Sequence, residues 1–487
     1  MRPDFANVQG IVRYGYGRCD AARFVPLLIT DEARARTWLR DLLSGARGLA
    51  LRDARLAPER DDVCINLALS YDGLRLVGLE APLLAQFSRE FQEGMAGDPQ
   101  RSRALGDRGE SAPERWRWGG PQNPTPHLML MIYGGQTIVA EVYERCLAHA
   151  AIHGLEEVLP LPPSLNLPGF KEHFGFTDGI AQPQVEGLDD PSDERWHGNR
   201  VRLGEVLLGY PNEYGQFTER PLLSAESERQ NLLPLDLGGS GKHDFARDGS
   251  YLVFRQLRQD VSAWWRSMDE ATGGRGREHP GSMVTLASKM MGRWPDGSSL
   301  ATSRDGPAPA GRADQDAFDY ARDPDGFGCP LGAHVRRANP RGSMPPERGG
   351  PSTTDQALAI GRRHRIVRRG RSFGSPLDAS MSPERLLAAD AGDEERGLHF
   401  MCLGANIARQ FEFLQQAWLL NPKFQGLCDD VDPVLGAHGS DGATGFSVPA
   451  LPLRKRYQTM SRFVSMLGGA YLFLPSFAAL RYLAGRS

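Results

Sequence analysis

The sequence predicts an α+β protein with two similar halves, because short apolar runs precede amphipathic helical stretches in both parts of the chain. Each half shows this alternation twice, although no repeat is visible at the level of individual residues. The pairs of expected strand and helix are residues 24–30 and 31–43, 127–135 and 137–155, 251–257 and 258–271, and 398–405 and 406–420.

Three long stretches rich in Gly, Pro, Ser and Arg interrupt this pattern, at residues 160–168, 272–314 and 339–360. Their length exceeds that of ordinary connections between secondary-structure elements. Aromatic and charged residues flank them, so we expect these stretches to wrap around a functional site rather than to act as disordered linkers.

The closing segment, residues 463–480, is uncharged and about long enough to cross a bilayer as a helix. Gly468, Gly469 and Pro475 divide it into short pieces rich in β-forming residues. The segment is therefore predicted to be a buried hairpin rather than a membrane span.

Composition excludes several classes of protein. The chain has 487 residues, 40% of them hydrophobic, and a formal charge of -3, which is ordinary for a soluble protein and does not favour nucleic-acid binding. Its six cysteines form no CxxC pair, so neither a zinc ribbon nor a disulfide scaffold is indicated. The amino terminus shows no signal-peptide pattern, and we expect a cytoplasmic protein.

His334 is a candidate metal ligand in the segment FGCPLGAHVRRANPR. The eleven histidines include no HExxH motif, so a closed zinc site is not predicted. Pro330 and Gly332 place His334 at the edge of a tight turn. The alternative is a structural or surface histidine, the commoner role of this residue type.

Asp178 lies in HFGFTDGIAQP, between two glycines and close to two phenylalanines. Glycines permit a ligand to approach the backbone closely, and aromatic rings can raise the pKa of a carboxylate until it shuttles protons near neutral pH. The alternative is an aspartate that hydrogen-bonds its own backbone in a turn.

Arg368 belongs to a run with six arginines between Arg362 and Arg371. Such a run is typical of a surface that binds nucleic acid or membrane, but no companion stripe of basic and aromatic residues accompanies it. A buried anionic cofactor also needs several arginines, to bind its carboxylates and to assist catalysis.

Together these segments resemble the dye-decolorizing peroxidases. GFTDG at residues 175–179 resembles the GxxDG signature of that family. Three further segments follow in the order that the family shows. Residues 328–341 resemble its proximal-histidine segment, and residues 366–374 resemble its distal-arginine segment. Residues 396–418 resemble the strand and helix that close its haem pocket. Residues 206–215 and 463–480 extend the similarity over most of the chain.

The resemblance implies two ferredoxin-like halves with antiparallel β-sheets and peripheral helices, and haem mainly in the C-terminal half. We expect the N-terminal half, 1–220, to end with the GFTDG distal loop, and the haem-binding half to span 221–487.

The same resemblance implies one haem b per chain and a peroxidase that reduces hydrogen peroxide to water. Small aromatic donors such as dyes and phenolics would be oxidised in one-electron steps through a ferryl intermediate. His334 would bind the iron, Asp178 would move a proton, and Arg368 would stabilise negative charge. The other residues assigned to the haem pocket are Arg341, which would contact a propionate, and Leu398, Phe400, Phe176 and Gly179.

Two departures from the family pattern affect the site. Gly370 stands where some branches carry an asparagine, so Asp178 and Arg368 are expected to be the polar distal groups. No acidic partner for the proximal histidine is found between Gln415 and Phe424, where Asn421 is the nearest polar candidate. An iron without such a partner would be less electron-rich.

Two other functions are compatible with these residues. A haem protein that releases iron or handles porphyrin would need His334 and a pocket, but not the peroxide chemistry of Asp178 and Arg368. A basic binding module around Arg362–Arg371 would bind nucleic acid in a salt-sensitive way. We expect neither nucleic acid nor membrane as a partner, and the oligomeric state is left open, a homo-oligomer included.

Overall fold

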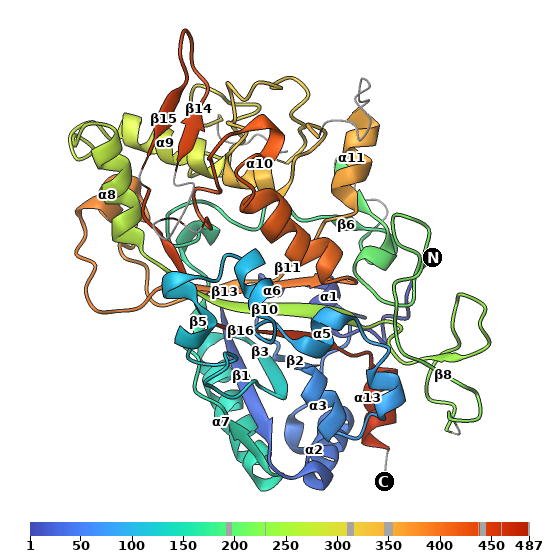
Figure 1. The fold of residues 1–487 in the computed structure, drawn as a ribbon. Coiled ribbons are helices and arrows are strands. Elements are labelled where there is room, and N and C mark those ends of the chain that lie inside the picture. Colours follow the sequence, from blue (N-terminus) through green and yellow to red (C-terminus); the bar gives the residue numbers. More distant parts are fainter. Residues whose placement is uncertain are drawn as a thin grey trace.

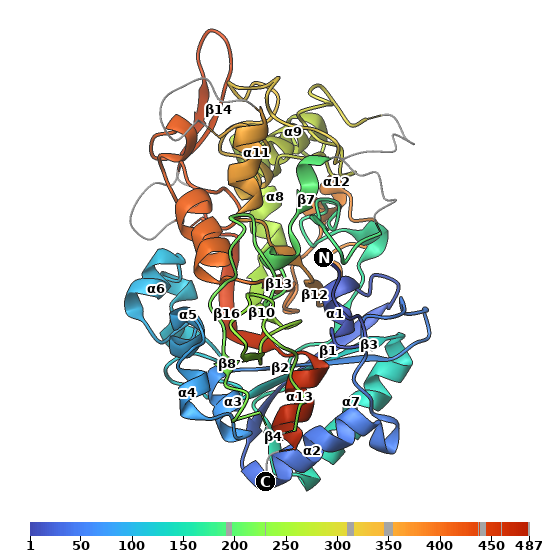
Figure 2. The same cartoon turned by 90° about the vertical axis from the view of Figure 1, so that its right-hand side faces the viewer.

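The computed structural model describes residues 1–190, 197–228, 230–308, 316–344, 354–436, 438, 445–458 and 460–485. Strands cross the middle of the molecule in Figure 1, with α2 and α7 below them and α8 to α11 above. Figure 2 shows the same division from the side, with α13 (Phe477–Ala484) beside the lower helices.

The strands of the N-terminal half are antiparallel neighbours in the order β2, β3, β1, and β4 pairs with β1. Their bounds are Ala21–Ile29 for β1, Cys64–Leu69 for β2, Leu128–Gly134 for β3 and Leu155–Glu157 for β4. Helix α2 (Glu32–Ser44) follows β1, and α7 (Gln136–Ile152) follows β3. Asp31 caps α2 through the backbone N–H of Arg34, and Gly45 ends that helix in the left-handed conformation.

The C-terminal half repeats this plan. Its strands are β10 (Ser250–Gln259), β11 (Val367–Arg368), β12 (Arg371–Phe373), β13 (Gly397–Gly404) and β16 (Val464–Leu474). Strand β10 lies between β13 and β16, and all of these pairings are antiparallel. Helix α8 (Val261–Ala271) follows β10, and two π-helical turns, Ala408–Glu412 and Leu414–Leu419, follow β13.

The two halves join at their strand edges. Phe473 of β16 pairs with Leu69 of β2, and Phe373 of β12 pairs with Ser164 of β5 (Ser164–Leu165). Because β10 also pairs with β13, the strands close into a ring. Phe24 of β1 meets Phe254 of β10 edge-on, 5.3 Å between ring centroids, so side chains from the two halves share one core.

The remaining helices and strands are short or peripheral. The helices are α1 (Gly10–Arg13), α3 (Tyr71–Leu76), α4 (Ala81–Leu84), α5 (Arg89–Glu93), α6 (Pro99–Ala104), α9 (Pro280–Met291), α10 (His334–Ala338), α11 (Thr354–Arg362), α12 (Pro383–Ala388) and α13 (Phe477–Ala484). The strands are β6 (Gln184–Val185), β7 (Arg200–Val201), β8 (Leu222–Leu223), β9 (His243–Asp244), β14 (Phe446–Val448) and β15 (Lys455–Tyr457).

The structure confirms the α+β class, the antiparallel sheets and all four predicted pairs of strand and helix. The hairpin predicted for residues 463–480 is wrong. Strand β16 runs through Gly468 and Gly469 without a turn, and after Pro475 the chain enters α13. Both glycines lie against other groups, since a Cβ at Gly468 would meet the Trp118 ring and one at Gly469 the Phe254 carbonyl.

Two of the predicted irregular stretches contain helices. Helix α9 lies within 272–314, and α11 begins within 339–360, while residues 309–315 and 345–353 lie outside the described part of the chain. In the described part, no helix is both long enough and apolar enough to cross a membrane. The division at residue 220 stays a prediction.

We expect Leu472→Ala to lower the free energy of unfolding by about 2 to 5 kcal/mol, because it removes a fully buried side chain and leaves a cavity. Chemical denaturation would measure the change. Leu56→Ala is the matched control, since Leu56 is 72% exposed and its truncation should alter stability by less than about 0.5 kcal/mol. Equal losses in the two variants would contradict the assigned core.

Candidate active site

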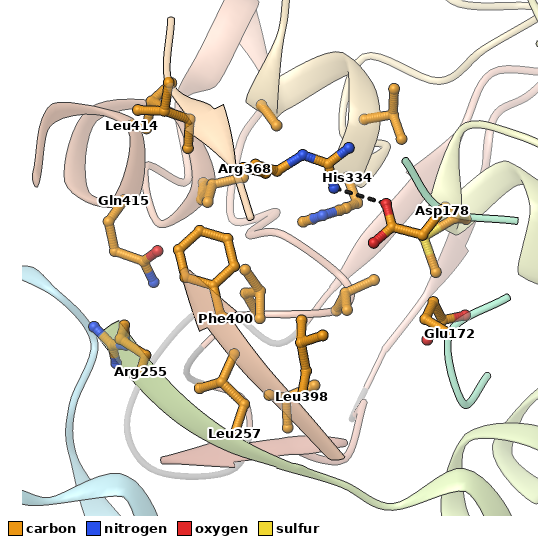
Figure 3. Close-up of a pocket in the computed structure, with 18 of the residues that line it drawn as sticks. Glu172, Asp178, Arg255, Leu257, His334, Arg368, Leu398, Phe400, Leu414 and Gln415 are labelled. Carbon is orange, nitrogen blue, oxygen red and sulfur yellow. Dashed lines mark hydrogen bonds and ion pairs between the residues drawn. The ribbon is translucent and has the colours of Figure 1, made fainter. Parts of the chain in front are cut away.

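A cavity of about 280 Å³ lies against the face of β10 and β13 that is turned away from the shared core (Figure 3). Leu257 of β10 pairs with Leu398 of β13, and Arg255 with Phe400, so these four side chains form one wall. The other walls come from residues 172–181, from the start of α10, from residues 364–368 and from the π-helical segment. The site is thus assembled from segments far apart in the chain.

Asp178 and Arg368 meet at this cavity. Arg368 Nη1 donates a hydrogen bond to Asp178 Oδ1 at 2.8 Å, and the backbone N–H of Gly179 donates to the same oxygen at 2.6 Å (Figure 3). Burial raises the pKa of Asp178, but the Arg368 charge and these hydrogen bonds outweigh burial, so the pKa lies below its ordinary value. Asp178 is therefore a carboxylate at neutral pH.

The backbone around Asp178 depends on its glycines. Gly175 and Gly179 both adopt positive φ, +94° and +82°, a conformation that other residues rarely take. A Cβ at Gly175 would also lie 3.0 Å from the Met381 carbonyl. The loop can turn Asp178 toward Arg368 because these positions carry no side chain.

Arg368 is positioned by the sheet. It lies on β11 and pairs with Cys402 of β13, and β13 is the strand directly beside β10. Two residues later, a Cβ at Gly370 would lie 3.0 Å from the His399 carbonyl. A side chain at position 370 would therefore be crowded by the backbone of β13.

His334 begins α10, and its Nδ1 lies 2.9 Å from Oδ2 of Asp432. The carboxylate accepts the Nδ1 hydrogen, so Nε2 is the nitrogen that can bind a ligand. Burial lowers the pKa of His334, but Asp432 raises it more, and the net pKa is above its ordinary value. Asp432 is fully buried, and its Oδ1 accepts the N–H groups of Val434 and Leu435.

Asp432 is the acidic partner of His334 that the sequence did not place. Asp432 lies 98 residues after His334 and beyond the stretch 415–424 where a carboxylate was sought. The sequence DDVDPVLG around it contains acids next to apolar residues, which is the one local signal that could have indicated a buried aspartate.

Buried Arg337 holds the two segments of this pair together. Its guanidinium donates to the carbonyls of Gly332, Trp418, Asn421 and Asp430. Burial lowers the pKa of Arg337 to about 10, so it remains charged at neutral pH. Gly332 lies two residues before His334, and Asp430 lies two residues before Asp432. Arg337 therefore fixes the backbone next to both members of the pair.

Of the other residues assigned to the pocket, Leu398, Phe400 and Phe176 line the cavity. Phe176 stacks on Trp265 with 4° between the rings, which fixes its orientation. Gly179 is not among the lining residues, and contributes its N–H to Asp178.

Arg341 also lies outside the cavity lining. Its guanidinium is buried and pairs with Asp316, and it donates to the Phe318 carbonyl. Arg293 and Arg365 line the cavity instead, and burial lowers the pKa of Arg365 to about 9. The propionate contact assigned to Arg341 stays a prediction, and the geometry favours Arg293 and Arg365 for that role.

Glu172 is a lining residue that the sequence interpretation missed. Its carboxylate accepts the N–H groups of Phe174 and Phe176 and a hydrogen bond from Gln259 Nε2 at 2.8 Å. Burial nevertheless raises its pKa to about 7. The distal polar groups therefore include a second carboxylate besides Asp178.

No family model matches the sequence. Among curated proteins, the chain is 30% identical over 333 residues to the multifunctional dye peroxidase DyP2 of an Amycolatopsis species, and 28% identical over 322 residues to the dye-decolorizing peroxidase msp1 of Mycetinis scorodonius. Each alignment covers 64% of this chain, but 61% and 56% of the two relatives. The chain thus matches less than two thirds of their length.

The fold of the whole chain is similar to that of solved structures. An ancestral D-type dye-decolorizing peroxidase superposes with a TM-score of 0.76 and 23% sequence identity, covering 100% of both chains. At this identity the likeness shows the fold, which confirms the ferredoxin-like α+β class.

We expect the stability of the wild-type protein to fall, relative to Glu172→Gln, as the pH rises from 4.5 to about 7. In this window the folded state holds a proton on Glu172 that the unfolded state has already lost, so raising the pH favours unfolding. Urea denaturation at several pH values would measure the difference. Glu278→Gln, at an exposed glutamate, is the control, and equal pH dependence in all three proteins would contradict the shifted pKa.

Proposed function

We propose that this chain, which resembles dye-decolorizing peroxidases in sequence and in fold, is a haem-dependent peroxidase. It reduces hydrogen peroxide to water and oxidises small aromatic donors such as dyes and phenols one electron at a time. The observation that carries this proposal is that the Asp178–Arg368 pair and His334, which is hydrogen-bonded to Asp432, line one largely apolar cavity.

The side chains of the cavity fit a haem group. Nε2 of His334 is available to bind iron, because Asp432 occupies Nδ1. Leu257, Leu398 and Phe400 offer an apolar surface for a macrocycle, and Arg293 and Arg365 could pair with its carboxylates. When bound, one haem b per chain supplies an iron that exchanges electrons with peroxide and with donors.

Asp178 is the group that moves a proton. As a carboxylate, it accepts the proton of one peroxide oxygen and returns it to the other, so that water becomes the leaving group. Proton transfer by a positioned side chain contributes typically ~100- to ~10,000-fold to a rate.

Arg368 serves both the carboxylate and the peroxide. Its charge keeps Asp178 deprotonated, and its guanidinium stabilises negative charge that develops as the O–O bond breaks. A permanently charged, planar group suits this role better than lysine.

We expect His334→Ala to lose the Soret band of bound haem, since the variant lacks the nitrogen that binds iron. Arg368→Leu should keep the band but react with one equivalent of peroxide at least ~100-fold more slowly, because it lacks the stabilising charge. Visible spectra and stopped-flow mixing would measure both effects.

Arg322→Leu is the control for these variants, because Arg322 is exposed and is not a residue of the cavity lining. A Soret band with slow peroxide reaction in the wild type would instead support the haem-handling function. Wild-type protein that binds no haem would contradict both functions.

We expect Asp432→Asn to raise the reduction potential of the bound haem iron and to lower peroxidase activity by ~10- to ~100-fold, because a neutral amide makes His334 a weaker electron donor. Spectroelectrochemical titration would measure the potential. Asp429→Asn, at an exposed carboxylate of the same loop, should leave both quantities unchanged. An unaltered potential in Asp432→Asn would contradict the assigned pairing.

A further inference from the structure

Three metal-ligating side chains meet where α7 packs on α2, on the lower side of the molecule in Figure 1 and away from α10. His149 lies in the last turn of α7, and His153 follows directly after that helix, one turn further along. Asp41 lies in the last turn of α2. One ligand atom from each side chain lies within 4.8 Å of the others. None of the three residues lines the cavity described above.

The distances suit a single small cation. Oδ2 of Asp41 lies 2.9 Å from Nε2 of His149 and 3.6 Å from Nε2 of His153. Donor atoms around one tetrahedral zinc ion lie about 3.3 Å apart, given metal–ligand distances of about 2.0 to 2.1 Å. The two observed distances bracket that value, so small side-chain rotations would complete the geometry.

The Nε2 lone pair of His153 is available to a cation beside the Asp41 carboxylate. Its Nδ1 lies 2.9 Å from the carbonyl oxygen of His149, which accepts the Nδ1 hydrogen. A backbone carbonyl that holds the distal N–H is the usual support of a metal-binding histidine, because it fixes the ring and its tautomer.

His149 lies deeper, with 1% of its side chain exposed. Its Nδ1 is buried and has no hydrogen-bond partner among the described residues. No second group therefore fixes the tautomer of His149, and its Nε2 can either donate to Asp41 or give its lone pair to a cation.

The charge of Asp41 is not neutralised by a permanent cation. Within the described residues, its ion pairs are with His149 and His153, and no lysine or arginine joins them. The Asp41 side chain is 30% exposed and that of His153 12%, so a hydrated ion can enter and keep a water ligand.

A simple hydrogen bond between Asp41 and His149 does not account for the third residue. The distance of 3.6 Å from His153 to Asp41 is too long for a hydrogen bond, yet the ring is held with Nε2 toward the carboxylate. Two imidazoles and one carboxylate form a donor set suited to zinc and similar transition ions rather than to magnesium or calcium.

We propose that Asp41, His149 and His153 bind one divalent transition ion of the zinc type, which links α2 to α7 on the outer face of the N-terminal half. The ion would hold together two helices that belong to different strand and helix units of that half. This site is independent of haem and of the peroxide reaction.

Isothermal titration of the purified full-length protein with zinc chloride, in a non-chelating buffer, tests the proposal. Wild type should bind one ion per chain. Asp41→Asn and His153→Gln should bind it at least ~10-fold more weakly, because each removes one ligand. His279→Gln, at an exposed histidine of another helix terminus, is the matched control and should bind zinc like wild type.

Two further measurements separate loss of the site from loss of the fold. Zinc should raise the Tm of wild type and of His279→Gln but not that of Asp41→Asn, whose Tm without zinc should stay close to that of wild type. Crystals soaked in zinc should show an anomalous difference peak between the three side chains. The proposal would be overturned if wild type bound no zinc, or if both site variants still bound one zinc ion per chain. It would also be overturned if the anomalous peak appeared only at another place in the crystal.

Discussion

Buried Arg337 is the residue through which the proximal side of the site depends on the rest of the fold. Its guanidinium joins the turn before His334 to the segment that carries Asp432 by donating to carbonyls in both. Other carbonyls that it binds end the π-helical segment, so three separate parts of the chain are held to one cation. Loss of a buried charge with this many partners would leave unsatisfied carbonyls in a region closed to water.

The distal side follows a different principle, in which a cation sets the ionisation of one carboxylate and burial sets that of another. Arg368 holds the pKa of Asp178 below its ordinary value, whereas burial raises the pKa of Glu172, which is hydrogen-bonded to Phe174, Phe176 and Gln259, to about 7. Both line the same cavity. Near neutral pH the site therefore contains one carboxylate that is always charged and one that takes up and releases a proton.

The fold places these groups by closing two sheets into a ring. Side chains on one face of β10 and β13 fill the shared core, so the opposite face is free to form the cavity wall. The period of two along the strands decides that Arg255, Leu257, Leu398 and Phe400 point to the cavity, while Phe254 and Met401 point to the core. Core packing and site geometry thus depend on one strand register.

The sequence by itself determined the α+β class and the strand and helix pairs, which follow from apolar periodicity. It also singled out His334, Asp178 and Arg368 as site candidates, through short segments that resemble one protein family. Periodicity failed where neighbours decided the outcome. Gly468 and Gly469 suggested a turn, but they lie within a strand because the Trp118 ring and the Phe254 carbonyl occupy the space of their side chains.

Only the tertiary structure decided which residues meet. Asp432 reaches His334 across 98 residues, Glu172 shifts its pKa because its surroundings exclude water, and Arg341 pairs with Asp316 rather than lining the cavity. Asp41 and the histidines of α7 likewise come together through the packing of two helices. Burial and contact between distant segments depend on the whole chain at once, and local sequence patterns do not encode them.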